Sequence, residues 1–192
     1  MRVGARSISL IGLPGGGKST IGRQLAKRLA WSFADTDAVI ERRIGCSIRA
    51  FFESDGEDRF RSIEADVLKE LVQRPETILA TGGGAILREK NRRALTDHTH
   101  VVYLRSTPEE IFRRLRNDSM RPLLQVRDPQ ARLRELHAER DPLYLETAEF
   151  VIDTGRPSVA GLVNMVLMQL ELAGAVDLYV VPSSVEVPVK PR

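Results

Sequence analysis

The sequence has few features that would place the protein in a membrane or in an oxidising compartment. Its 192 residues contain a single cysteine, Cys46, which cannot form an internal disulfide bond. No apolar run is long enough to cross a bilayer, and the run that follows Arg6 is interrupted by Gly12 and Pro14 without a cleavage-site pattern behind it. We therefore expect a soluble, cytoplasmic protein.

Aromatic residues and net charge are also low. Aromatic side chains make up 5% of the sequence, and the formal net charge is only +3, although the isoelectric point is near 9.3. Arginines gather between Arg105 and Arg140, but acidic residues alternate with them, so the segment does not form an uninterrupted basic surface. We expect small anionic ligands rather than nucleic acid or a membrane as partners. We also expect a monomer, because no exposed apolar stripe stands out.

The rest of the composition is typical of one globular α/β domain. Hydrophobic residues account for 42% of the chain and charged residues for 29%. Short buried-strand patterns alternate with segments of helical periodicity, which predicts a parallel sheet covered by helices on both faces. We expect strands at Ile8–Ile11, within residues 31–37, and at Thr77–Thr81, His100–Leu104 and Phe150–Asp153, and helices at Lys18–Leu29, within residues 56–74, and at Pro108–Arg116, Asp128–Arg140 and Ser158–Leu172.

This domain is expected to span residues 1–175. Residues 117–127 lack clear periodicity, which favours a mobile loop. Residues 176–192 contain three prolines and follow the last predicted helix, so we expect a loosely attached tail, with an edge strand as the alternative.

The stretch GLPGGGKS at residues 12–19 matches the phosphate-binding pattern G-x-x-x-x-G-K-[ST] at every fixed position. It lies between a predicted strand and a predicted helix, as such a loop requires. Backbone N–H groups of the loop and the N-terminus of the helix can surround phosphate oxygens, while Lys18 neutralises the β- and γ-phosphates and Ser19 ligates Mg²⁺. A flexible glycine-rich turn is the alternative, and the flanking elements favour a nucleotide site.

Asp35 and Asp37 follow the second predicted strand and are the clearest carboxylates for a metal ion. Their spacing places both side chains on one face if the backbone stays extended. The alternative is a cluster that caps a helix opening at Ala38. We favour the functional interpretation, because the metal otherwise lacks a protein carboxylate. Asp153 also ends a strand, but turn chemistry can explain its position.

Two further patterns remain open on spacing alone. Glu57, Arg61 and Glu64 lie on one stripe of a predicted helix. Arg61 therefore either forms a solvated ion pair or is held by its acidic neighbours to bind a substrate carboxylate. Gly82–Gly84 follow a buried strand, where glycines indicate either a close approach to the backbone or a tight strand-to-helix turn.

Six motifs together resemble the shikimate kinase family. GLPGGGKST, DTD, GEDRFRSIE, TGGG, MRPLL and ERDPLY occur in that family's order, between about Ile8 and Ser158. The resemblance implies a three-layer α/β/α sandwich with a central parallel sheet, like that of P-loop NTPases and nucleoside monophosphate kinases. It implies one kinase domain with a lid around residues 117–127. It also implies ATP- and Mg²⁺-dependent phosphorylation of the 3-hydroxyl of shikimate, which yields 3-phosphoshikimate and ADP in chorismate and aromatic amino-acid biosynthesis.

The resemblance also implies roles for individual residues. Lys18, Asp37 and Arg121 would act in catalysis, with Arg121 reaching over the transferring phosphate from the lid, and the loop at residues 153–157 would lie beside the adenine. The nucleotide would be bound by Gly15, Gly16, Gly17, Lys18, Ser19, Thr20 and Arg121, the Mg²⁺ by Ser19 and Asp35, and shikimate by Asp37, Arg61, Gly83 and Arg140.

Other functions share part of this pattern. A kinase for gluconate or for a nucleoside monophosphate would share the loop through Ser19, but the set of Asp37, Arg61 and Arg140 favours a small acid as substrate. A nucleotide-binding module without catalysis would not need Lys18, Asp35 and Arg121, and a guanine-binding N/T-K-x-D sequence is absent. A nucleic-acid-associated ATPase is disfavoured by the small size of the chain and by the absence of a clear basic face.

Overall fold

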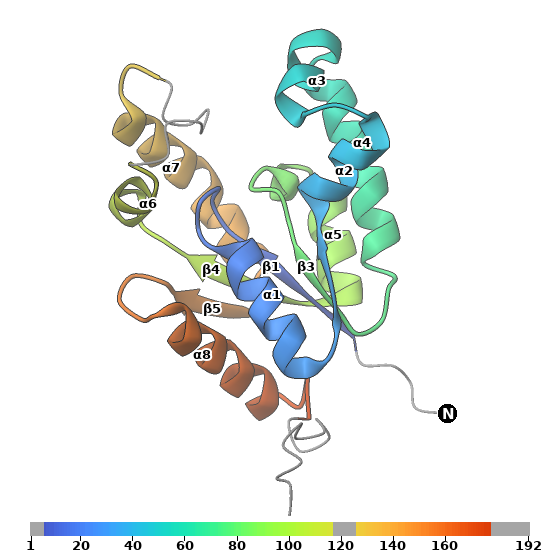
Figure 1. Ribbon diagram of the computed structural model, residues 1–192, viewed down its shortest axis with the longest axis vertical. Coiled ribbons are helices and arrows are strands. Elements are labelled where there is room, and N and C mark those ends of the chain that lie inside the picture. The colour runs from blue at the N-terminus through green and yellow to red at the C-terminus, as the bar shows by residue number, and fades with distance from the viewer. Residues whose placement is uncertain (1–5, 117–125, 178–192) are drawn as a thin grey trace, which may run out of the picture.

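A five-stranded parallel sheet forms the centre of the molecule in the computed structural model, which describes residues 6–116 and 126–177. The strands are β1 (Ser7–Ile11), β2 (Ser32–Asp35), β3 (Thr77–Ala80), β4 (Thr99–Arg105) and β5 (Phe150–Asp153). They lie in the order β2-β3-β1-β4-β5, which places the first strand in the middle (Figure 1). All pairings are parallel, with Leu10 opposite Ala80 on one side and opposite Val102 on the other.

Helices cover both faces of this sheet, as the alternation of strands and helices predicts. They are α1 (Lys18–Leu29), α2 (Thr36–Ile44), α3 (Ile48–Asp55), α4 (Glu57–Leu71), α5 (Glu89–His98), α6 (Pro108–Leu115), α7 (Pro129–Thr147) and α8 (Val159–Leu172), with a 3-10 turn, η1, at Ala85–Leu87. α1 and α8 enclose one hydrophobic core, which includes Leu25 and Ile78. The helices of the other face enclose a second core, which includes Leu68, Tyr103 and Tyr144. The predicted α/β class is confirmed.

Most predicted elements lie close to their expected positions. α1 and β5 begin and end at the predicted residues, and each of the other predicted strands and helices has a counterpart. The sequence does not predict α3 and α5, and it offers a helix near α2 only as an alternative. α5 buries only Asn91 and Leu95, so its ten residues carry too few apolar side chains to show a helical period.

α7 is longer than the sequence predicts. The prediction ends this helix at Arg140, whereas the helix continues through Pro142 to Thr147. A proline inside a helix removes one backbone hydrogen bond and crowds the preceding turn, so it normally indicates a helix end. Tyr144 and Thr147 are buried beyond the proline, and the burial of this last turn stabilises the helix despite the local cost.

The expected lid and tail lie largely outside the described residues, because residues 117–125 and 178–192 are not among them. Val176, which the sequence assigns to the tail, is 7% exposed and belongs to the core beneath α8. In residues 6–116 and 126–177, no helix has both the length and the apolar character needed to span a bilayer.

Candidate active site

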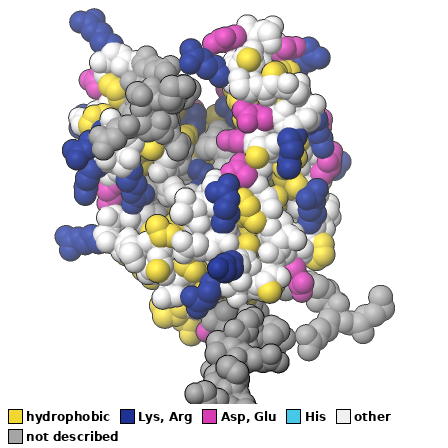
Figure 2. All heavy atoms as spheres, in the orientation of Figure 1, with side chains coloured by type: hydrophobic (Ala, Val, Ile, Leu, Met, Phe, Trp, Pro, Cys, Tyr) yellow, Lys and Arg dark blue, Asp and Glu magenta, His cyan; other side chains and the backbone are white. Residues whose placement is uncertain are grey.

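A pocket of about 310 Å³ opens where β1, β2 and β3 end. The loops that follow these strands meet at one edge of the sheet, because parallel strands all end on the same side. The surface of the molecule is hollowed between the part that carries α6 and α7 and the part that carries α2–α4 (Figure 2). The pocket is lined by Pro14, Gly15, Gly17, Lys18, Ser19, Thr20, Asp35, Asp37, Thr81 and Gly83.

The loop between β1 and α1 requires glycine at several positions. Gly12, Gly15 and Gly17 have positive φ angles of 145°, 82° and 88°, which residues with a Cβ rarely adopt. At Gly15, a Cβ would also lie 2.6 Å from Cδ1 of Leu115 on α6. These glycines allow the backbone to turn tightly around the pocket.

Lys18 begins α1, and its ammonium group is held inside this loop. Its Nζ donates hydrogen bonds to the carbonyl oxygens of Gly12, at 2.7 Å, and Leu13, at 2.9 Å. Gly17 precedes the helix and has no side chain with which to cap the first N–H groups of α1. A buried ammonium group beside an uncapped helix N-terminus is suited to binding phosphate.

Ser19 and Asp35 face each other across the pocket. The Ser19 hydroxyl donates a hydrogen bond to Oδ2 of Asp35 at 2.6 Å. Oδ1 of Asp35 accepts hydrogen bonds from the backbone N–H groups of Asp37, at 3.1 Å, and Ala38, at 3.5 Å, so Asp35 is the N-cap of α2. The helix-capping alternative is therefore correct for Asp35, while its second carboxylate oxygen stays directed at Ser19.

Asp37 lies in the first turn of α2, not on extended backbone as its spacing from Asp35 suggests. The strand ends at Asp35 because that side chain caps the helix, which begins at Thr36. The first turn nevertheless directs Asp37 into the same pocket. Burial, together with the charge of Asp35, raises the pKa of Asp37 to about 6, and the opposite charge of Lys18 limits this rise.

Gly82–Gly84, which follow β3, allow side chains from two helices to approach the backbone closely. A Cβ at Gly82 would lie 2.6 Å from Oδ1 of Asp37. A Cβ at Gly84 would lie 2.5 Å from Nη1 of Arg61. Of the two interpretations that the sequence leaves open, the close approach therefore applies, although η1 also begins directly after this cluster.

Arg61 is held by acidic neighbours on its own helix. Its Nη1 donates to Oε2 of Glu64 at 2.8 Å, and its Nη2 donates to Oε1 of Glu57 at 3.1 Å. The Arg61 and Glu64 side chains are only 13% and 2% exposed, so this ion pair is not a solvated one. Burial raises the pKa of Glu64, and the hydrogen bond from Arg61 opposes that rise.

Arg140 approaches the same acid from α7. Its positive charge, like that of Arg61, acts to lower the pKa of Glu64. The Nε of Arg140 is buried, and no group in the described part of the chain accepts a hydrogen bond from it. Glu64 also lies beside Asp37, whose pKa its charge raises. The charge of this buried acid thus acts on Asp37, and the charges of Arg61, Arg88 and Arg140 act on the acid in turn.

The structure brings most of the predicted site residues together, although their roles remain predictions. Eight of them line the pocket, and Gly16 lies in the same loop, where its N–H donates to the Leu13 carbonyl at 3.1 Å. Arg61 and Arg140 do not line the pocket and are linked to it through Glu64. Arg121 lies outside the described residues.

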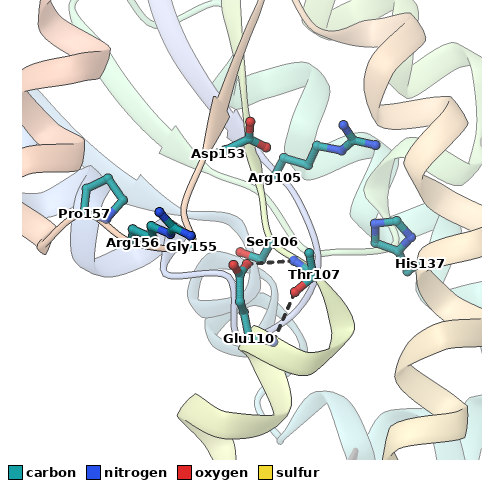
Figure 3. A pocket seen from close by; sticks show the side chains of 9 residues that line it. All are labelled: Arg105, Ser106, Thr107, Glu110, His137, Asp153, Gly155, Arg156 and Pro157. Atoms are coloured by element: carbon teal, nitrogen blue, oxygen red, sulfur yellow. Dashed lines mark hydrogen bonds between the residues drawn. The ribbon is translucent and has the colours of Figure 1, made fainter.

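A second cavity, of about 630 Å³, lies at the ends of β4 and β5 and shares no lining residue with the first. Figure 3 shows Arg105 and Asp153 close together at the strand ends, with His137 of α7 and Glu110 of α6 at other sides of the cavity. Basic and acidic side chains both line it, so the cavity has no single charge.

The loop that follows β5 forms one wall of this cavity and is attached to α6. Arg114 Nη2 donates to the carbonyl oxygen of Thr154 at 2.5 Å, and the Thr154 and Ser106 hydroxyls are 2.5 Å apart. At Gly155, a Cβ would collide with the carboxylate of Glu110. The loop therefore has a defined position next to the start of α6.

The sequence interpretation names Glu64 as a neighbour of Arg61 but not its closeness to Asp37, and it gives no role to Tyr144. The Tyr144 hydroxyl donates to the carbonyl oxygen of Gly83 at 2.6 Å. The only available signal was position, since Glu64 lies three residues after Arg61 and Tyr144 lies four residues after Arg140.

Comparison with known proteins gives a consistent result. The protein family described as "Shikimate kinase" matches residues 14–171. The shikimate kinase of Paracidovorax citrulli is 56% identical over 177 residues, which cover 91% of this chain and 97% of that relative. The shikimate kinase of Burkholderia thailandensis is 55% identical over 170 residues, which cover 88% of this chain and 92% of the relative.

Solved structures agree with these sequence matches. A shikimate kinase from Acinetobacter baumannii in complex with shikimate has a TM-score of 0.83 and 43% identity, and the match covers 90% of this chain and 96% of that chain. A gluconokinase from Sinorhizobium meliloti, with 19% identity and a TM-score of 0.57, is similar in fold alone. The predicted fold, an α/β sheet of the kind found in P-loop kinases, is confirmed.

Proposed function

The chain belongs to the shikimate kinase family, and on that premise we propose that it transfers the γ-phosphoryl group of ATP to the 3-hydroxyl of shikimate. The observation that carries this proposal is the link through Glu64 between the pocket and two arginines. Lys18 and Asp37 line the pocket, and the buried Glu64 lies beside Asp37, Arg61 and Arg140. A small acid with a nearby hydroxyl fits such an arrangement.

The loop between β1 and α1 would bind the phosphates of ATP. Phosphoryl transfer depends mainly on positioning and on neutralising charge, which backbone N–H groups and one ammonium group can provide. Lys18 now donates to two carbonyl oxygens of its own loop, and phosphate oxygens would replace or share these acceptors. Gly15, Gly16, Gly17 and Thr20 would complete the nucleotide site.

Ser19 and Asp35 would hold Mg²⁺. A hydroxyl and a carboxylate oxygen 2.6 Å apart are hard oxygen ligands of the kind that Mg²⁺ accepts, and this ion usually takes one or two protein ligands together with phosphate oxygens and water. Bound there, the ion would supply positive charge to the β- and γ-phosphates. The fit depends on Asp35 keeping one oxygen directed at Ser19 while the other caps α2.

Asp37 would accept the proton of the attacking hydroxyl or orient that hydroxyl. With a pKa near 6, its carboxylate is a better proton acceptor at neutral pH than an ordinary aspartate and is still mostly ionised. Its closeness to Lys18 supports this role, because the attacking oxygen and the γ-phosphate must meet between these two side chains.

Arg61 and Arg140 would bind the carboxylate of shikimate. A guanidinium group matches a planar carboxylate with paired hydrogen bonds, so two arginines can distinguish a small acid from a neutral sugar. Gly83 would let the ring of the substrate approach the backbone. Arg121 would contact the transferring phosphate, a role that rests on the resemblance of MRPLL to the family motif.

The second cavity would receive the adenine, next to the loop at residues 153–157. Ser106 lies between the second cavity and the loop that precedes α1, since it lines this cavity and a Cβ at Gly16 would lie 3.6 Å from its hydroxyl. Arg114 and Thr154 support this proposal because they fix the loop against α6.

Initial rates of ADP formation with shikimate, quinate and gluconate, each at saturating ATP and Mg²⁺, test the proposed function. We expect shikimate to be phosphorylated with the highest kcat/KM by a wide margin. Equal rates with gluconate would contradict the assigned substrate. Tight ATP binding without acid-dependent ADP formation would instead favour a nucleotide-binding module.

We further propose that the protein is a monomer that acts in the cytoplasm. Met168 and Leu172 lie four residues apart on α8 and are 51% and 77% exposed, the highest values among the large apolar side chains of residues 6–116 and 126–177. A light-scattering mass of a dimer, reduced to that of a monomer by Leu172→Glu, would overturn the monomer proposal and identify α8 as the interface.

A further inference from the structure

Tyr144 connects two elements of the proposed shikimate site, namely the loop after β3, which would face the ring, and α7, whose Arg140 would bind the carboxylate. Tyr144 is fully buried, and its hydroxyl donates a hydrogen bond to the carbonyl oxygen of Gly83 at 2.6 Å. It lies one helical turn after Arg140, so both side chains leave the same face of α7. Burial raises the pKa of the Tyr144 hydroxyl, and the neighbouring guanidinium group of Arg140 opposes that rise.

Gly83 has little room to move away from this contact. On its other side, a Cβ would lie 2.6 Å from Cδ of Pro14 in the phosphate-binding loop. The preceding residue, Gly82, donates its N–H to Oγ1 of Thr36 at 2.9 Å. The Gly83 peptide therefore lies between the phosphate-binding loop and the Tyr144 hydroxyl, and this hydroxyl helps to set where the backbone meets the pocket.

The ring of Tyr144 is supported from behind by Tyr103. The two rings stack, with centroids 4.8 Å apart and an interplanar angle of 29°. The Tyr103 hydroxyl donates to Oδ1 of Asp141 at 2.7 Å, and Asp141 also pairs with Arg105. The stacked pair thus carries two buried hydroxyls. One contacts the proposed substrate loop, and the other contacts Asp141, the partner of Arg105 in the second cavity.

From these contacts we infer that the Tyr144 hydroxyl is a positioning group for the shikimate carboxylate site. It fixes the Gly83 peptide and the Arg140 guanidinium relative to each other, although Tyr144 itself does not line the pocket. The buried Nε of Arg140 has no acceptor among the described residues, so no hydrogen bond at that atom holds the guanidinium group. The inference rests on the proposed function and predicts an effect on the affinity for shikimate and not on that for ATP.

The substitution Tyr144→Phe removes the hydroxyl and keeps the stacked ring. We expect the KM for shikimate to rise about five- to tenfold, because one buried hydrogen bond is lost and the Arg140 guanidinium group shifts. The KM for ATP and kcat should change by less than about twofold, because neither the phosphate-binding loop nor Asp37 contacts this hydroxyl.

Tyr103→Phe is the matched control, since it removes the other buried hydroxyl of the same pair. Both variants should lower the melting temperature to a similar extent, and only Tyr144→Phe should raise the KM for shikimate. An equal rise in both variants would show a general loosening of the core and overturn the inference. An unchanged KM in a folded Tyr144→Phe protein would overturn it as well.

A double-mutant cycle with Arg140→Ala tests the connection itself. If the hydroxyl acts partly through Arg140, Tyr144→Phe raises the shikimate dissociation constant less in the Arg140→Ala protein than in the wild type. An undiminished effect would overturn this role. The same assays separate this inference from the proposed function. A wild-type protein that does not phosphorylate shikimate would refute the function. An active wild type together with unchanged kinetics of Tyr144→Phe would refute only the inference.

Discussion

The two halves of the candidate active site are built in different ways. The phosphate half comes from consecutive residues of one loop and one helix turn, within Gly12–Thr20. The acid-binding half comes from α2, α4, α7 and the loop after β3, and its Arg61 is held by the buried Glu64. The first half therefore depends on backbone conformation, whereas the second depends on packing between elements. Substitutions in the second half should affect stability as well as binding.

The largest effect is expected at Lys18, in the phosphate half. Lys18→Ala removes the side-chain charge that we propose for phosphate binding in this loop, so turnover should fall by about 10³-fold. The melting temperature should change little compared with this loss. Steady-state ADP formation and thermal unfolding measure the two effects.

Lys27→Ala is a matched control, because Lys27 lies on the same helix and is exposed. It should keep wild-type turnover. Normal turnover in Lys18→Ala would contradict the assignment of this loop to phosphate binding.

Asp37, where the two halves meet, should give the next largest effect. Asp37→Asn removes the proton acceptor and keeps the shape of the side chain, so turnover should fall by about 10²-fold. The same substitution should stabilise the protein at neutral pH, because a buried charge beside Asp35 is removed. A loss of activity together with a gain in stability would indicate a functional group whose burial destabilises the folded protein.

The pH dependence of this stabilisation follows from the raised pKa of Asp37. At a pH below 3.8, the ordinary pKa of aspartate, Asp37 is protonated in both the folded and the unfolded protein. Its charge then has no effect on the difference in stability between the wild type and Asp37→Asn. As the pH rises from 3.8 to about 6, the unfolded chain releases the proton first and the wild type loses stability relative to Asp37→Asn. Above that range the difference should level off at about 1–3 kcal/mol. Urea unfolding of both proteins at pH 4, 5, 6 and 7.5 would reveal a constant difference if the assignment is wrong.

Arg61 tests whether the acid-binding half depends on packing. Arg61→Ala should raise the KM for shikimate about 30- to 100-fold, because the variant loses a charged partner of the carboxylate, and ATP binding should stay close to that of the wild type. It should also lower the free energy of unfolding by about 2–3 kcal/mol, because the buried Glu64 loses its ion pair. Shikimate titrations and urea unfolding separate the two effects.

The double variant Arg61→Ala/Glu64→Gln is the control that separates binding from stability. Replacing the buried carboxylate by a neutral amide should restore much of the lost stability, while the KM for shikimate stays high. Recovery of both properties would mean that Arg61 acts only as a partner for Glu64. Equal loss of ATP and shikimate affinity would contradict the division of the pocket into two halves.

This difference between the halves also decides what the sequence could predict. The phosphate-binding loop could be predicted because its spacing specifies the backbone geometry, and α1 begins at Lys18 as expected. The role of Glu64 could not be predicted, because side chains three and four residues away from Arg61 can reach it equally well on a helix. In three dimensions Glu64 lies close to Gly82 and is 2% exposed, whereas Glu57, the other partner of Arg61, is 61% exposed.

Local capping explains a second error. The spacing of Asp35 and Asp37 correctly places both residues in one pocket, but the assumption of extended backbone is wrong, since the Asp35 side chain starts α2 one residue later. A carboxylate that caps a helix and one that faces a metal are usually treated as alternatives. Asp35 has two oxygens, and the structure uses one for the cap and directs the other at Ser19.

The smallest effect is expected at the C-terminus, because none of the described residues after α8 lines the pocket. Removing residues 178–192 should leave turnover and both KM values at their wild-type levels. A truncation after Gly174 should also leave these constants unchanged. It deletes Val176, which is 7% exposed in the core beneath α8. It also deletes the N–H of Ala175, which donates a hydrogen bond to the Leu170 carbonyl at 2.8 Å. We therefore expect the shorter protein to be less stable by about 1–2 kcal/mol. A loss of turnover in the protein that ends at Asp177 would mean that residues after Asp177 contribute to the site. The phosphate half and the acid-binding half, as defined above, would then not include the whole site.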